Sequence, residues 1–154
     1  MVMVPVTVDE LRALALDGFL PGRHEAVAAD QQLADSFGVP LGEEAEAAAL
    51  QLADVLGLTA GGDRRLVLVA EPAADTVEQR GDQTVTVTRL PRDAVLAFFT
   101  GAAVPAAGRF AGLSLDAAWP LPEIQHMLAS DPLQWHDLSE LDAWLAEVGR
   151  SPTW

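Results

Sequence analysis

Histidine and carboxylate side chains are the groups of this chain that could carry acid–base or metal chemistry. The 154 residues include three histidines, His24, His126 and His136. Glu123 and His126 have the i, i+3 spacing that places a carboxylate and an imidazole on one helix face, as in carboxylate-bridged dimetal bundles. Such a centre needs a second Glu–His pair and more glutamates on facing helices, and the sequence supplies one pair. We therefore predict no metal site and interpret this pair as a solvated helix turn.

The tripeptide Trp135-His136-Asp137 brings a histidine next to an aspartate in the sequence. In a strand, successive side chains point to opposite faces, so His136 and Asp137 cannot orient each other. Trp135 would share a face with Leu133 and Asp137. We predict that Trp135 anchors the core and that His136 lies on the other side.

Motifs for nucleophilic catalysis and phosphate binding are incomplete. Ser114, within the segment Gly112–Asp116, lacks the second glycine of a nucleophile elbow. Gly61-Gly62-Asp63 lacks the further residues of a phosphate-binding loop, and Arg80-Gly81-Asp82 fits a hairpin turn. Cysteine is absent, which excludes a thiol nucleophile and a disulfide. We predict no catalytic residue and no cofactor, and we favour a non-enzymatic role without deciding the question.

Three arginines lie close in sequence to a possible pocket. Arg89, Arg92 and Arg109 bracket Phe98-Phe99 and the stretch 101–112. A guanidinium group matches carboxylates and phosphates, so one interpretation is an anion pocket. The other, which we favour, is that they pair with the chain's own acidic residues, because these are far more numerous.

The chain is strongly acidic, with 23 Asp and Glu against 9 Arg and a formal net charge of −14. Residues 1–63 carry 11 acids and 2 arginines, residues 64–112 carry 5 and 6, and residues 113–154 carry 7 and 1. This charge repels phosphate backbones, so we expect no nucleic-acid partner. We predict that the two acidic segments bind a basic protein partner. The residues expected to do so are Glu43, Glu44, Glu46, Asp137, Glu140 and Asp142.

Hydrophobic periodicity predicts an α+β fold, with a single mixed or antiparallel sheet of about five to six strands covered by about four to five helices. Thr7 and Glu10 form a capping box for the first helix, which we expect to end at Gly18. The remaining helices are expected at 30–37, 42–56, 122–129 and 139–149. Seven segments are candidates for the strands of this sheet: 1–6, 25–28, 66–69, 77–79, 84–88, 94–99 and 133–137. We assign residues 1–149 to one globular domain and residues 150–154 to a short C-terminal tail.

Three further expectations concern the second half of the chain. Residues 91–100 fit either a strand or a helix that starts at Pro91, and we favour the strand. The Ala-, Gly- and Pro-rich stretch 101–112 predicts a mobile loop. Ser139 is expected to cap the final helix, in which Leu141, Trp144, Leu145 and Val148 would be buried.

The N-terminal stretch 1–6 is apolar but short, and it lacks the basic region of a signal peptide. Asp9 and Glu10 follow it after two residues. No run of 18 apolar residues occurs in the sequence, so we expect no membrane association. Together with the absence of cysteine, this favours a cytoplasmic location.

The composition indicates a GC-rich genome, because Lys, Asn and Tyr are absent and Ile124 is the single isoleucine. Five segments, in order, carry a family resemblance: VPVT-DELRAL---DG, GEEAEAAALQLA, RRLVLVAEP, TVTVTRLPRDAVLAFF and LQWHDLSEL. Their layout resembles an uncharacterised family of small acidic proteins from high-GC Gram-positive (actinobacterial) bacteria. The resemblance covers residues 1–100 and 131–145. It implies a fold and a taxonomic origin but no activity.

Two functional hypotheses follow. The first is a non-enzymatic acidic interaction module, an adaptor, inhibitor or regulator, that docks on a basic protein. The alternative is a small-molecule-binding protein or enzyme with a pocket under residues 101–120, which would use Arg109, Trp119 and His126. The sequence makes no prediction of oligomeric state.

Overall fold

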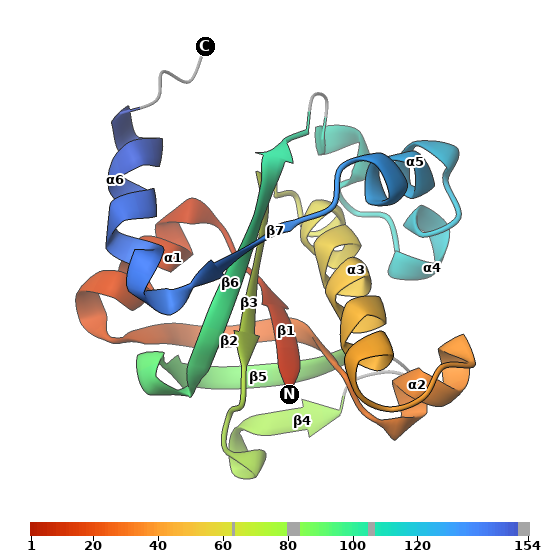
Figure 1. The fold of residues 1–154 in the computed structure, drawn as a ribbon, viewed down its shortest axis with the longest axis horizontal. Helices are drawn as coiled ribbons and strands as arrows, with labels where there is room; N and C mark the ends of the chain where they lie inside the picture. The colour runs from red at the N-terminus through yellow and green to blue at the C-terminus, as the bar shows by residue number, and fades with distance from the viewer. Residues whose placement is uncertain (63, 80–83, 105–106, 151–154) are drawn as a thin grey trace.

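A computed structural model of the chain describes residues 1–62, 64–79, 84–104 and 107–150. Over these residues, seven strands form one sheet in the order β4-β5-β2-β1-β3-β6-β7, and all neighbouring strands are antiparallel (Figure 1). This confirms the α+β class and the single sheet, although the sheet has more strands than expected. The strands are β1 (Val2–Pro5), β2 (Phe19–Ala28), β3 (Arg64–Ala70), β4 (Val77–Gln79), β5 (Thr84–Pro91), β6 (Val95–Ala103) and β7 (Gln134–Asp137).

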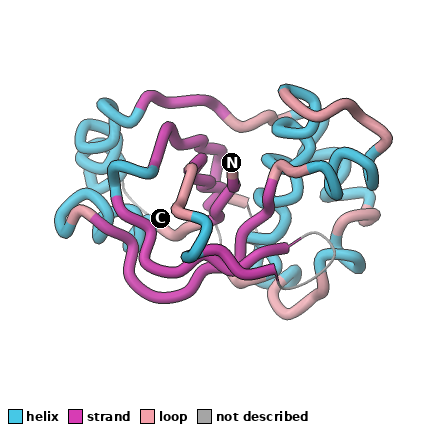
Figure 2. Tube along the Cα trace, turned by 90° about the horizontal axis from the view of Figure 1, so that it is seen from below, coloured by secondary structure: helices cyan, strands magenta, loops and turns pink. Residues whose placement is uncertain are grey.

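Helices cover the sheet from two sides, with α1 and α6 on one side and α2 to α5 on the other (Figure 1). The view from below shows the same two groups of helices with the strands between them (Figure 2). The α-helices in the described residues are α1 (Val8–Asp17), α2 (Gln31–Phe37), α3 (Glu43–Thr59), α4 (Leu115–Ala118), α5 (Pro122–Ser130) and α6 (Leu141–Arg150).

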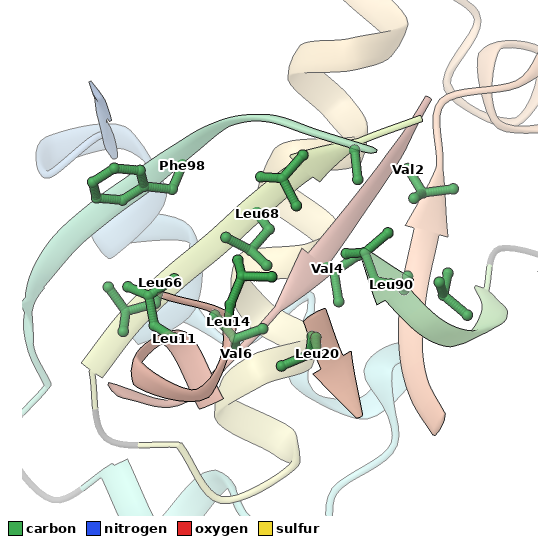
Figure 3. Close-up of a cluster of buried hydrophobic side chains, with 14 of the residues drawn as sticks. Val2, Val4, Val6, Leu11, Leu14, Leu20, Leu66, Leu68, Leu90 and Phe98 are labelled. Carbon is green, nitrogen blue, oxygen red and sulfur yellow. The ribbon is translucent and has the colours of Figure 1, made fainter. Parts of the chain in front are cut away.

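The first helix begins and ends where the sequence predicted. The Thr7 hydroxyl accepts a hydrogen bond from the Glu10 amide at 3.1 Å, and the Glu10 carboxylate accepts one from the Thr7 amide at 2.9 Å. At the other end Gly18 has φ 80°, a left-handed conformation that costs glycine little. Leu11 and Leu14 are the fully buried residues of this helix, and they pack towards β1 and β3 (Figure 3).

A hydrophobic cluster lies on each face of the sheet. The central strands are therefore buried on both faces. Six of the seven residues of β3 are buried. Leu66 and Leu68 belong to the cluster beneath α1 and α6, whereas Val67 and Val69 pack with α3. A third cluster joins the end of α3 to α4 and α5. The near-continuous apolar sequence of this strand therefore reflects its central position.

The ambiguous tract forms a strand, as we favoured. Residues Val95–Ala103 make up β6, which pairs with β3 and β7. The loop predicted at 101–112 is wrong at its start, because residues 101–103 continue β6. Residues 107–110 of the predicted loop form a short 3₁₀ turn, and residues 105 and 106 lie outside the described residues. Pairing with Arg64 at the start of β3 extends β6 to Ala103. The turn predicted at 80–82 lies outside the described residues.

Two other boundaries differ from the prediction. The strand expected at 25–28 is the end of the ten-residue β2, which pairs with β5 from Phe19 to Val27 with a register shift between Leu20 and Arg23. Ser139, which was expected to cap the final helix, lies within a 3₁₀ turn, Leu138–Glu140, that precedes α6, and Asp137 caps this turn. In α6, Leu141 and Leu145 are buried as predicted, whereas Trp144 and Val148 are only partly buried.

Candidate protein-interaction surface

An apolar groove of about 490 Å³ lies between α3 and β7. We call it the α3–β7 groove. Its wall on α3 consists of Glu46, Ala47 and Leu50, and Trp135 of β7 forms the opposite side. Its remaining lining residues come from the N-terminal segment, β3 and β6, namely Met1, Met3, Val69, Leu96, Ala97 and Phe99. Figure 1 shows α3 beside β1, β3 and β6, the strands that supply most of these remaining lining residues.

Exposed large hydrophobic side chains gather at this groove. Met1, Leu96 and Trp135 are 41%, 45% and 59% exposed, and they are three of the six such residues in the described chain. The prediction that Trp135 anchors the core is therefore wrong. Trp135 lies opposite Phe99 on the edge strand β7, and α3 packs over β1, β2 and β3 instead. The strand alternation was correct, but the described helices leave this indole uncovered.

The other face of β7 carries His136, as the alternation predicted. Its ring stacks on Phe98 at a centroid distance of 4.8 Å, and its Nε2 lies 2.8 Å from the Thr100 hydroxyl. Its Nδ1 lies 3.7 Å from the Glu140 carboxylate. The three groups have the order of a hydroxyl–imidazole–carboxylate relay, but Thr100 is only 7% exposed. A substrate cannot reach that hydroxyl, so the arrangement favours a packing role.

One predicted acidic cluster borders the groove. Glu43, Glu44 and Glu46 occupy the first turn of α3, where Gly42 provides no side-chain cap. Their carboxylates therefore complement the positive end of the helix dipole. Glu43 and Glu44 are exposed, and Glu46 is half-buried within the groove wall. The structure thus places one of the three directly beside the exposed hydrophobic residues.

In the second predicted acidic cluster, two residues form a capping box and the third is exposed. Asp137 accepts hydrogen bonds from the side chain and the amide of Ser139, and these lower the pKa of its carboxyl group. Glu140 accepts a hydrogen bond from the Asp137 amide at 2.8 Å, which completes a capping box. Asp142 lies exposed in the first turn of α6. Because Asp137 follows Trp135 by two residues, it shares the groove-facing side of β7.

The arginines predicted to bracket a pocket do not converge. The guanidinium group of Arg89 lies 5.6 Å from the centre of the Phe19 ring. Arg92 donates to the Ala15 carbonyl at 3.4 Å. Arg109 forms an ion pair with Glu123 at 2.7 Å and covers the Phe110 ring. Of the three, Arg109 shows the acidic pairing that we favoured.

A small cavity of about 240 Å³ adjoins Trp119, as the alternative hypothesis expected for the 101–120 region. Phe37, Leu52 and Leu115 line it, and Asp116 is its one charged lining residue. Neither Arg109 nor His126 lines this cavity. Within the described part of the chain, no group of three or more His, Asp or Glu side chains could hold a metal ion.

A buried ion-pair network escaped the sequence analysis. Arg65 is 2% exposed and Asp54 is 3% exposed. The Arg65 guanidinium donates to both Asp54 oxygens at 2.7–3.1 Å, and its Nη1 donates to Asp131 at 3.0 Å. Burial raises the pKa of Asp54, against the opposing effect of hydrogen bonds and charge from Arg65. The signal was an arginine within an apolar strand and an aspartate on the apolar side of a helix.

The described residues define a helix–sheet–helix α+β protein with an open apolar groove at one edge of its sheet. None of its described helices is both long and apolar enough to cross a membrane. The chain belongs to a family of unknown function, DUF6912, whose model matches residues 1–145. No curated protein and no solved structure matches it.

Proposed function

We propose that this protein is a non-enzymatic interaction module that binds a basic, amphipathic segment of a protein partner in the α3–β7 groove. The observation that carries the proposal is the juxtaposition of the exposed Trp135 indole and the Glu46 carboxylate in one groove. The net charge of −14 supports a partner that is positively charged. Its magnitude exceeds the value of about 2–8 that solubility of a small domain requires.

The apolar side chains of the groove and the carboxylates at its rim would contribute differently to binding. Aromatic residues in the centre of an interface supply most of the affinity, because they bury large apolar areas. Trp135, Leu96 and Met1 offer such area. Carboxylates at the rim mainly raise the association rate by attracting a cationic partner. Glu43, Glu44 and Asp137 are placed for that role.

The ligand-binding alternative has less support. The cavity at Trp119 has one charged lining residue, Asp116, and the arginines nearest to it in sequence point elsewhere. A specific small-molecule site normally combines an apolar pocket with several convergent polar groups. We therefore place the interaction surface at the groove and not under residues 101–120.

The proposal extends to the cellular setting. The composition and the order of segments support an origin in a high-GC Gram-positive bacterium, and the lack of cysteine supports the cytoplasm. The partner would then be a basic cytoplasmic protein that the chain recruits, inhibits or regulates.

The test compares the wild-type protein with two single variants as immobilised baits in an extract of the organism that encodes the chain. Trp135→Ser removes the groove indole. Leu16→Ser is the matched control, because Leu16 is 83% exposed on α1 and does not line the groove. Both replacements affect exposed side chains, so the urea midpoints should stay close to that of wild type. Mass spectrometry identifies a partner that the control retains and Trp135→Ser loses.

Stopped-flow experiments with the purified partner then measure how each residue affects the association and dissociation rates. We expect Trp135→Ser to weaken binding about thirtyfold, mostly through faster dissociation. Glu46→Arg should slow association, and Asp17→Arg, with the same change of net charge on α1, should slow it less. The absence of any partner that Leu16→Ser retains and Trp135→Ser loses would contradict the proposal. So would an association rate that does not fall between low and physiological salt.

A further inference from the structure

A second cavity, of about 290 Å³, lies where the sheet opens between β1 and β2. These strands pair at Val2 and Met3, and β2 then diverges to pair with β5. The space left beside Pro5 is enclosed by the start of α1, the last turns of α3 and the first residues of β3. We call it the β1–β2 cavity. It shares no lining residue with the α3–β7 groove.

Two acidic residues of this cavity are already paired within the protein. The Glu10 carboxylate accepts a hydrogen bond from the Thr7 amide and lies 3.2 Å from His24 Nδ1. His24 Nε2 lies 2.9 Å from the Pro21 carbonyl, so both ring nitrogens face oxygen acceptors. Asp54 is held by Arg65. Neither carboxylate is therefore available to attract a cationic ligand.

Arg64, in contrast, lines the cavity without a partner. Its side chain is half-buried and makes no hydrogen bond, ion pair or ring contact with the described residues. This is unusual here, because acids outnumber arginines 23 to 9. Arg23, at the same cavity, pairs with Glu78 at 3.3 Å. An arginine with free donors that lines a concave site is suited to bind a carboxylate or a phosphate.

The charged residues around Arg64 favour a carboxylate over a phosphate as the ligand. Glu25 lines the cavity from an exposed position, and Glu10 lies within it. Two carboxylates close to a single free guanidinium disfavour a doubly charged phosphate more than a singly charged carboxylate. Val6, Leu58 and Leu66 provide an apolar wall for the rest of a ligand. A volume near 300 Å³ lies at the lower end of small-molecule sites.

We propose that the β1–β2 cavity binds a small monocarboxylic acid, with its carboxylate on the Arg64 guanidinium and its apolar body against Val6, Leu58 and Leu66. This site is independent of the proposed protein-docking groove, and either one could exist without the other. Ligands of this class are organic acids with a short aliphatic or aromatic body.

Three probes test the proposal by NMR titration of the full chain. Phenylacetate carries the carboxylate and an apolar body, phenylacetamide has the same shape without the charge, and inorganic phosphate has charge without the body. We expect phenylacetate to shift the amide signals of residues 6–7, 56–58 and 64–66. Phenylacetamide should bind about tenfold more weakly or worse, because it loses the charge-assisted hydrogen bonds. Phosphate should leave these signals unchanged.

Two arginine variants complete the experiment. Arg64→Gln should weaken phenylacetate binding by about tenfold or more. Arg12→Gln is the control, because Arg12 is exposed and pairs with Asp9 outside the cavity. Should Arg64→Gln not fold, Arg64→Lys replaces it, and a several-fold weakening is expected because the planar fork is lost.

Several results would overturn the proposal. One is the absence of phenylacetate shifts at the cavity, and another is equal binding of phenylacetate and phenylacetamide. Phosphate that binds there as tightly as phenylacetate would exclude a monocarboxylate site. Shifts confined to residues around Trp135 would place the acid in the groove instead. Unchanged affinity in Arg64→Gln would remove the assigned contact.

Discussion

At the scale of single residues, the most constrained groups are two opposite charges inside the fold. Arg65 comes from β3 and Asp54 from α3, so their ion pair links the sheet to the helix that packs on it. Taking both charges out of water is costly, and the contact offsets that cost only while both partners are present. Gly101 of β6 helps to admit Arg65, since a Cβ at this position would lie 3.0 Å from the Arg65 Cβ.

We predict that Asp54→Ala lowers the free energy of unfolding by about 3–5 kcal/mol, because it leaves the buried Arg65 charge with only the half-exposed Asp131. The double replacement Asp54→Leu/Arg65→Met should cost less than the single one, since no charge remains to be buried. Urea denaturation followed by circular dichroism measures both.

Asp131→Asn is the control for that measurement. Its carboxylate is 54% exposed, so its loss should cost no more than about 1 kcal/mol. If Asp54→Ala costs as little as Asp131→Asn, the buried pair does not hold α3 to the sheet.

At the scale of elements, the start of α6 shows how one carboxylate serves a helix terminus. Asp137 ends β7, caps the 3₁₀ turn that follows and forms a capping box with Glu140. The lowered pKa of Asp137 means that the folded protein binds its proton less tightly than the unfolded chain does. Its contribution to stability is therefore complete above the ordinary pKa of 3.8 and is lost as the pH falls through the lower folded-state value.

We predict that Ser139→Ala raises the pKa of Asp137 towards 3.8, because the hydroxyl hydrogen bond is the largest cause of the lowering. The backbone amide of residue 139 remains and preserves part of the effect. An NMR titration of the Asp137 carboxyl carbon measures the change. Ser130→Ala is the control, since the Ser130 hydroxyl donates to the His126 carbonyl in α5. An unchanged Asp137 titration in Ser139→Ala would show that the cap does not depend on this hydroxyl.

At the scale of the whole molecule, the net charge of −14 opposes compaction. Like charges held close together in a folded domain repel one another more than in an expanded chain. Glu43, Glu44 and Glu46 add to this repulsion locally, although the helix dipole compensates part of it. The proposed basic partner would relieve the same repulsion when it binds.

We predict that the thermal unfolding midpoint rises by a few degrees when NaCl increases from about 10 to about 150 mM, because the Debye length contracts from about 30 to about 8 Å. The triple variant Glu43→Gln/Glu44→Gln/Glu46→Gln carries three fewer negative charges and should show a weaker salt dependence. Differential scanning calorimetry measures both. A midpoint that stays constant or falls with salt would show that self-repulsion is not a significant term.

Local features of this protein were predictable from sequence because neighbouring residues determine them. The capping box at Thr7, the left-handed Gly18 and the buried strand at 66–69 depend on spacing along a short segment. Longer elements were predicted less well. The extension of β2 and of β6 depends on partners in β5, β3 and β7, which are distant in the sequence.

The sequence by itself determined the fold class, the start of most helices and the acidic charge, since these follow from residue type and local periodicity. Only the tertiary structure decided which apolar side chains are covered. Alternation placed Trp135 and His136 on opposite faces of β7, but it could not tell that helices would cover the His136 face and leave the indole at an open edge. Likewise, the pairing of Arg65 with Asp54 depends on how α3 packs against β3. Burial depends on contacts between segments far apart in the chain, and local sequence patterns do not encode these contacts.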